Sequence, residues 1–157
     1  MKNYLLLLAA ACTLTFTACN NDDEDPKTTK TNLLTSGSWK VSTSTVSPAI
    51  DINGDGTTET DLTPFIKACT KDDVTNYKAD KTYTEEEGAT KCNPNDPQVF
   101  TTGTWTFTDN ETKLTVTPSG ASPTTYSIME LSGNTLKVSD TFTDSTVTYT
   151  NIITYIH

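Results

Sequence analysis

The chain has 157 residues and a formal net charge of −9, from 11 basic and 20 acidic side chains, and 34% of its residues are hydrophobic. A chain of this length forms one domain, which excludes a multidomain enzyme. All the basic residues are lysines, so no arginine is present to bind phosphate, which argues against nucleic-acid binding. The only histidine is the terminal His157, which excludes histidine-based catalytic triads and ordinary zinc sites from the interior, while 35 threonines favour a β-rich fold.

Residues 1–18 predict a lipoprotein signal peptide. Lys2 gives a basic start, an apolar stretch covers residues 4–16, and small residues precede Cys19. The apolar stretch is short for a membrane span and lies where a cleaved export signal lies, although a buried N-terminal helix is an alternative. The FTAC sequence at 16–19 resembles the lipobox of bacterial lipoproteins, which implies lipidation of Cys19 and anchoring in the outer membrane.

Residues 19–32 predict a lipidated, acidic and flexible tether. Four of the six residues at 20–25 are acidic, and this run resembles the export tag of surface lipoproteins in one Gram-negative group. A solvated linker is the alternative, so both the cell surface and the periplasmic face of the outer membrane stay open. Residues 26–32 have almost no apolar surface to bury, as expected of a tether.

Residues 33–157 predict one all-β domain, because short alternating segments recur with turn residues between them. A meander with one apolar and one polar face indicates an eight-stranded antiparallel up-and-down barrel, whose closure removes exposed edges. Between the first two strands, Thr63 and Pro64 favour the start of one short helix that reaches Cys69. The expected strands cover residues 39–46, 74–78, 82–86, 104–108, 113–117, 124–131, 135–139 and 146–156.

The inward parity of these strands assigns a set of aromatic side chains to the barrel interior. An eight-stranded barrel is either filled by its own side chains or holds one small ligand, and a lined void above roughly 300 Å³ would favour the ligand. The acidic run Glu85, Glu86 and Glu87 is interpreted as a solvated face rather than a hydrolytic pair. The candidate lining residues are Trp39, Tyr77, Tyr83, Trp105, Phe107, Tyr126 and Tyr149.

The segment 51–61 resembles the DxNxDG loops that bind calcium. Oxygen-bearing side chains occupy loop positions 1, 3 and 5, a glycine at position 6 permits a sharp turn, and Leu62 replaces the bidentate glutamate of an EF-hand. We therefore expect a structural calcium ion rather than a sensor site, with an ordinary Asn/Gly/Asp turn as the alternative. The candidate ligands are Asp51, Asn53, Asp55, Thr57 through its carbonyl, Glu59 and Asp61.

Two cysteines remain for the mature domain. Cys12 leaves with the signal and Cys19 carries lipid, so Cys69 and Cys92 are left as a pair. In an oxidising envelope two such thiols most simply form a disulfide. A redox or metal pair is the competing interpretation, but no CxxC spacing or nearby histidine favours it.

Two triplets carry a family resemblance. Gly37, Ser38 and Trp39 open the first expected strand, and Gly103 to Trp105 repeat the pattern in the fourth. The first triplet resembles the GxW motif that opens the first strand of lipocalins. Together with the FTAC box and the cysteine pair, the chain looks like the lipocalin-like domains of bacterial outer-membrane lipoproteins, which implies a calycin-type barrel.

These observations predict a non-enzymatic, monomeric, lipid-anchored envelope protein with a β-barrel. The resemblance to lipocalins implies that this barrel binds a small apolar or amphipathic molecule at one mouth. The alternative is an accessory or structural surface protein with a filled barrel, which contacts a protein or glycan partner through its loops. A catalytic role is a third interpretation, and it would require acids or a nucleophile converging at a pocket mouth.

Overall fold

The computed structural model describes residues 29–157. The expected signal peptide, the lipidated Cys19 and the tether up to residue 28 lie outside the described residues. No helix within the described part of the chain is long and apolar enough to cross a membrane.

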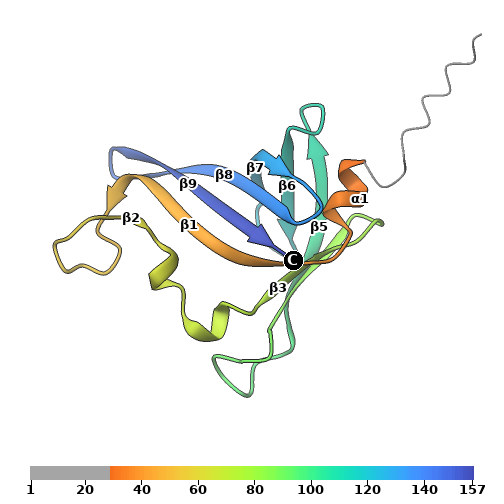
Figure 1. Ribbon diagram of the computed structural model, residues 1–157, viewed down its shortest axis with the longest axis horizontal. Coiled ribbons are helices and arrows are strands. Elements are labelled where there is room, and N and C mark those ends of the chain that lie inside the picture. Colours follow the sequence, from red (N-terminus) through yellow and green to blue (C-terminus); the bar gives the residue numbers. More distant parts are fainter. Residues whose placement is uncertain (1–28) are drawn as a thin grey trace, which may run out of the picture.

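The described chain is an all-β domain preceded by one short helix (Figure 1). Its sheet runs β2-β1-β3-β4-β5-β6-β7-β8-β9, and an additional antiparallel pairing of β1 with β9 closes eight of the nine strands into a barrel. The predicted antiparallel eight-stranded barrel is therefore confirmed. The elements are α1 (Lys30–Leu34), β1 (Ser38–Ile50), β2 (Glu59–Asp61), the 3-10 turns η1 (Thr63–Phe65) and η2 (Ala68–Thr70), β3 (Val74–Tyr77), β4 (Thr82–Glu86), β5 (Val99–Thr108), β6 (Lys113–Pro118), β7 (Thr124–Leu131), β8 (Thr135–Asp144) and β9 (Val147–Ile156).

The helical segment differs in place from the prediction. Instead of one helix across residues 63–69, the chain forms two single 3-10 turns, because Ile66 returns to extended backbone between them. Thr63 is held against β1, where the Ser44 amide donates to its Oγ1 at 3.0 Å. The true helix α1 precedes β1, and Thr29 caps it by accepting a hydrogen bond from the Asn32 amide at 3.2 Å.

The strands β1, β8 and β9 continue beyond the barrel as a ribbon, which Figure 1 shows extending to one side. The β8–β9 ladder continues without a register shift to the pair Asp144 and Val147, well past the expected end at residue 139. At the ribbon tip the rings of Phe142 and Tyr149 stack with centroids 5.2 Å apart. Exposed Val147 lies beside them at the tip, so this part of the sheet is held by pairing rather than by a core.

The core fills one end of the barrel. Its fully buried members include Leu34, Trp39 and Trp105, and Leu34 of α1 has no exposed surface. The indole Nε1 of Trp39 donates to the Leu34 carbonyl at 2.8 Å, which fixes α1 across the barrel end. The buried cluster comprises Leu34, Trp39, Tyr83, Trp105, Leu114, Val116, Leu136 and Val138. We call this end, where α1 and the chain terminus meet, the floor.

Candidate functional site: the barrel mouth

Both tryptophans of the repeated triplets are sealed at the floor by side chains distant in sequence. The imidazole of His157 lies 4.0 Å from the ring of Trp39, centroid to centroid. The ammonium of Lys81 lies 3.9 Å from the Trp105 ring centroid, in a cation–π contact. These contacts stabilise the floor, and sequence reasoning missed both because nothing in the local pattern links a strand opening to a distant turn or to the last residue.

The opposite end of the barrel is open and contains a cavity of about 200 Å³. This volume is below the roughly 300 Å³ at which pockets for drug-sized ligands begin. The cavity therefore does not reach the volume expected of a ligand-holding barrel: most of the barrel is filled, and the remaining space accommodates only a molecule smaller than a drug-sized ligand. The lining residues are Trp39, Val41, Thr70, Asp73, Val74, Thr75, Glu85, Phe100 and Tyr155.

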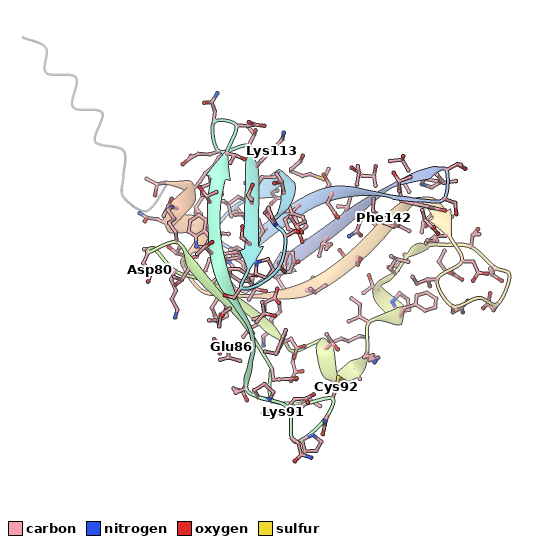
Figure 2. All side chains as sticks on the ribbon, turned by 180° about the vertical axis from the view of Figure 1, so that it is seen from behind. Asp80, Glu86, Lys91, Cys92, Lys113 and Phe142 are labelled. Atoms are coloured by element: carbon pink, nitrogen blue, oxygen red, sulfur yellow. A yellow bond between two sulfur atoms is a disulfide. The ribbon has the colours of Figure 1, made fainter. Side chains whose placement is uncertain are left out.

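Strand register brings a carboxylate into this cavity. Thr75 pairs with Trp39 across β1 and β3, and with Glu85 across β3 and β4. Cross-strand partners share a face of the sheet, so Glu85 lies on the inward face with the buried Trp39. Figure 2 places Glu86, the next residue of β4, between the floor turn at Asp80 and the mouth loop that carries Lys91 and Cys92.

The acidic run was expected to be a solvated face, and the structure corrects that interpretation. Glu85 lines the cavity, and Glu87 is only 8% exposed. Its Oε2 has no hydrogen-bond partner within residues 29–157. Burial, followed by the charges of Asp73 and Asp96, raises the pKa of Glu87. The signal that could have found these acids is parity, since Glu85 lies two residues after the inward Tyr83 on β4 and Glu87 continues the same alternation just past the end of the strand.

Four tyrosines of the interior are affected by the negative charge of Glu85. They are Tyr77, Tyr83, Tyr126 and Tyr155, and within residues 29–157 their hydroxyls form no hydrogen bond to a protein group. Burial raises the pKa of all four, that of Tyr83 to about 12, and the negative charge of Glu85 adds to the rise at each of them. The interior beneath the mouth is thus anionic and lined by aromatic rings.

The seven aromatic residues predicted to line the interior fall into four groups. Trp39 contributes to the cavity wall, while Tyr83 and Trp105 are buried core residues. Tyr77, Phe107 and Tyr126 pack against the core as partly buried neighbours. Tyr149 lies on the ribbon beyond the barrel, stacked on Phe142.

The predicted calcium ligands are gathered in one exposed loop between β1 and β2. The Asp51 carboxylate accepts hydrogen bonds from the Gly54 amide at 2.7 Å and the Gly56 amide at 2.9 Å, and both glycines have positive φ, 76° and 87°. The amide of Thr57, followed by the Asn53 side chain, lowers the pKa of Asp55. Within residues 29–157 no group of three or more His, Cys, Asp or Glu side chains is arranged to hold a metal ion.

Glu59 and Asp61 lie on β2 at the end of this loop. Glu59 Oε2 accepts a hydrogen bond from the Ile52 amide at 3.4 Å, which connects the two ends of the loop. Asp61 instead accepts the Thr63 amide at 2.9 Å, and the Thr63 hydroxyl and amide lower its pKa. The side-chain oxygens of Asp51, Asn53, Asp55 and Glu59 therefore accept hydrogen bonds from amides of the same loop, whereas Asp61 binds Thr63 outside it.

The disulfide between Cys69 and Cys92 is confirmed. Their Cα atoms lie 5.1 Å apart, and the bond joins η2 to the loop between β4 and β5 (Figure 2). Thr70, the residue after Cys69, lines the cavity. The disulfide therefore braces one side of the barrel mouth.

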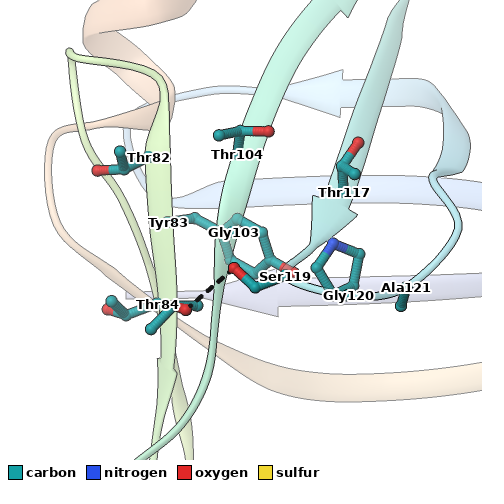
Figure 3. A pocket seen from close by; sticks show the side chains of 11 residues that line it. Thr82, Tyr83, Thr84, Gly103, Thr104, Thr117, Ser119, Gly120 and Ala121 are labelled. Carbon is teal, nitrogen blue, oxygen red and sulfur yellow. Dashed lines mark hydrogen bonds between the residues drawn. The ribbon is translucent and has the colours of Figure 1, made fainter.

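An open groove of about 540 Å³ lies elsewhere, on the barrel wall where β4, β5 and the end of β6 meet (Figure 3). Its surface carries the hydroxyls of Thr82, Thr84 and Ser119. Gly103 lies at the bottom of the groove. A Cβ atom at this position would lie 2.6 Å from Tyr83 Cε1, so only glycine fits. No charged side chain lines this groove, in contrast to the cavity at the mouth, which Asp73 and Glu85 line.

Comparison with known proteins identifies one family. The sequence model of the family described as a lipocalin-like domain matches residues 35–138. The match includes both tryptophan triplets, the disulfide and the strands from β1 into β8. No curated protein matches the chain.

Proposed function

The chain belongs to the lipocalin-like domain family, and from this premise we propose that it is a non-enzymatic, lipid-anchored envelope protein that binds a small amphipathic molecule at the mouth of its barrel. One observation carries the binding role. The barrel is closed at the floor by Leu34 and Trp39, yet it retains a cavity of about 200 Å³ at the other end, between Trp39, Val41 and Tyr155. A concave site with apolar walls and a few polar groups is the usual form of a small-molecule site.

The anchoring part of the proposal is supported by sequence. The FTAC box at 16–19 and the acidic run that follows it favour lipidation of Cys19 and attachment to the outer membrane. The Cys69–Cys92 disulfide is consistent with an oxidising compartment. Mass spectrometry of the full chain purified from its envelope tests this part, because a lipid-modified N-terminal cysteine adds the mass of its acyl chains.

Native mass spectrometry of the same preparation tests binding. We expect extra mass of an organic molecule that survives gentle ionisation and leaves on denaturation. The variant Val41→Phe, which fills the cavity wall, should lose this mass. Thr43→Phe is the matched control, because Thr43 is exposed on the same strand. If neither the parent nor the Thr43→Phe variant retained an organic molecule, the binding role would be contradicted.

The outer groove supports a second candidate, a surface protein that contacts a glycan. Hydroxyl-rich, uncharged walls such as those of Thr82, Thr84 and Ser119 suit hydrogen bonding to sugar hydroxyls. Glycan binding that is lost in Ser119→Tyr but kept in Val41→Phe would support this role. Loss of glycan binding in Val41→Phe alone would instead place the glycan-binding site at the mouth.

A further inference from the structure

The carboxylates of the mouth have no cationic partner. Glu85 and Asp73 both line the cavity, and no lysine does. Within residues 29–157 the one salt bridge joins Lys113 to Asp109, far from the mouth. Asp73 Oδ1 accepts a hydrogen bond from the Gly88 amide at 3.2 Å, but within the described residues it forms no ion pair. A carboxylate in a partly desolvated cavity favours an ion of opposite charge.

The remaining walls suit a cation as well as an apolar group. Trp39 and Tyr155 present aromatic surface inside the barrel, and Phe100, which is 46% exposed, adds a third ring at the rim. A cation is attracted to the negative face of an aromatic ring, most strongly where water is excluded. The aromatic rings and the carboxylates of this cavity therefore both attract a cationic ligand.

The surrounding charges strengthen this preference. The charge of Glu85 acts on all four interior tyrosines, where it adds to the effect of burial in raising their pKa values. Asp140 acts in the same way on Tyr126 and Tyr155. Glu87 is buried with an unpartnered oxygen, and the charges of Asp73, Asp96 and Asp72 raise its pKa while that of Lys91, which does not line the cavity, lowers it. An anionic ligand would meet this negative potential without any compensating lysine in the wall.

We infer that the ligand of the mouth is a small organic cation, an amine carried on an apolar body, held by Glu85 and Asp73 with its apolar part against Trp39, Phe100 and Tyr155. This inference rests on the proposed binding function and specifies its ligand class. The cavity of about 200 Å³ sets the size, since it excludes long acyl chains from full burial.

Three probes of nearly equal shape test the charge preference. They are phenethylamine, 2-phenylethanol and phenylacetate, which are cationic, neutral and anionic at neutral pH. The full chain is held in nanodiscs of zwitterionic lipid, and binding is followed by tryptophan fluorescence, since Trp39 is part of the wall. Empty nanodiscs and nanodiscs with free tryptophan correct for partitioning and quenching. We expect the amine to bind at least about tenfold more tightly than the alcohol, a difference of about 1.4 kcal/mol, and phenylacetate to show no saturable binding.

Conservative variants identify the carboxylates. Glu85→Gln should weaken amine binding about tenfold, to the level of the alcohol, while alcohol binding stays unchanged. Asp73→Asn should weaken amine binding in the same direction. Glu86→Gln is the matched control, because Glu86 follows Glu85 on the opposite face of β4 and its Oε1 accepts hydrogen bonds from Asn76 and Thr84 that glutamine can also accept.

The outcomes separate the two proposals. Equal affinity of the parent protein for amine and alcohol, or unchanged amine binding in Glu85→Gln, overturns the cation preference while leaving the binding function intact. Saturable binding of phenylacetate also overturns it. If none of the three probes binds above the control nanodiscs, the binding function itself fails. The probe series needs no variant to fold, so the first comparison remains decisive even if a variant is unstable.

Discussion

Replacing Leu34 tests whether α1 closes the barrel. Leu34 has no exposed surface and belongs to the same buried cluster as Trp39 and Trp105. Leu34→Ala removes roughly three methylene equivalents, which cost about 2.4 kcal/mol in transfer free energy. The cavity left behind raises the expected loss in the free energy of unfolding to about 3 kcal/mol or more. Because the Trp39 indole donates to the backbone carbonyl of residue 34, that hydrogen bond persists in the variant.

The neighbouring Leu33 supplies a matched control. It lies in the same one-turn helix but is only partly buried, so Leu33→Ala should cost less than about 1 kcal/mol, since alanine and leucine have similar helix propensities. Urea unfolding followed by tryptophan fluorescence measures both variants, with an unchanged slope if compactness is preserved. Similar losses in the two variants, or a loss below about 1 kcal/mol for Leu34→Ala, would refute the docking of α1 on the floor.

Three other features make separate predictions. If the loop at 51–61 holds calcium, the parent protein should show a chelator-sensitive melting temperature, and Asp51→Ala with Asp55→Ala should abolish that sensitivity; a parent indifferent to chelator would exclude the site. Replacing Cys69 and Cys92 by serine opens a loop with a sequence separation of 23 and should lower the free energy of unfolding by about 3 kcal/mol. If reduction of the parent protein left its free energy of unfolding unchanged, that result would argue against the bond. Glu87→Gln should raise the melting temperature at neutral pH, because a raised carboxyl pKa means that the folded state favours the neutral form. That gain should shrink as pH falls towards the ordinary glutamate pKa of 4.5, where the parent is itself protonated, and a gain independent of pH would contradict the assigned cause.

Alternation along the strands predicted the barrel well, because inward side chains such as Trp39 and Leu114 are buried on every second position. The expected strand end at residue 139 was too early. Residues 141–144, which extend β8 beyond that end, are all exposed, so no alternation of buried apolar residues marks them as strand. They stay in β8 through ladder hydrogen bonds to β9, which leave no trace in the hydrophobic pattern.

The site was harder to predict than the fold. A run of three glutamates is usually solvated, and composition alone gave no reason to bury Glu87 or to turn Glu85 inward. The register that places Glu85 opposite Thr75 depends on the β3–β4 turn, whose geometry the sequence does not specify by itself. The contacts of His157 and Lys81 with the two tryptophans depend on barrel closure, a long-range event without a local signal.

The floor joins both ends of the described domain. Ser36 Oγ, just after α1, lies 3.2 Å from Nε2 of the terminal His157. The nine residues between Cys19 and Thr29 span at most about 30 Å when extended. A chain anchored through Cys19 would therefore be attached to the bilayer at its closed end, with the mouth at the end of the barrel opposite the attachment. A ligand that enters there would reach the mouth from the aqueous phase without passing the floor.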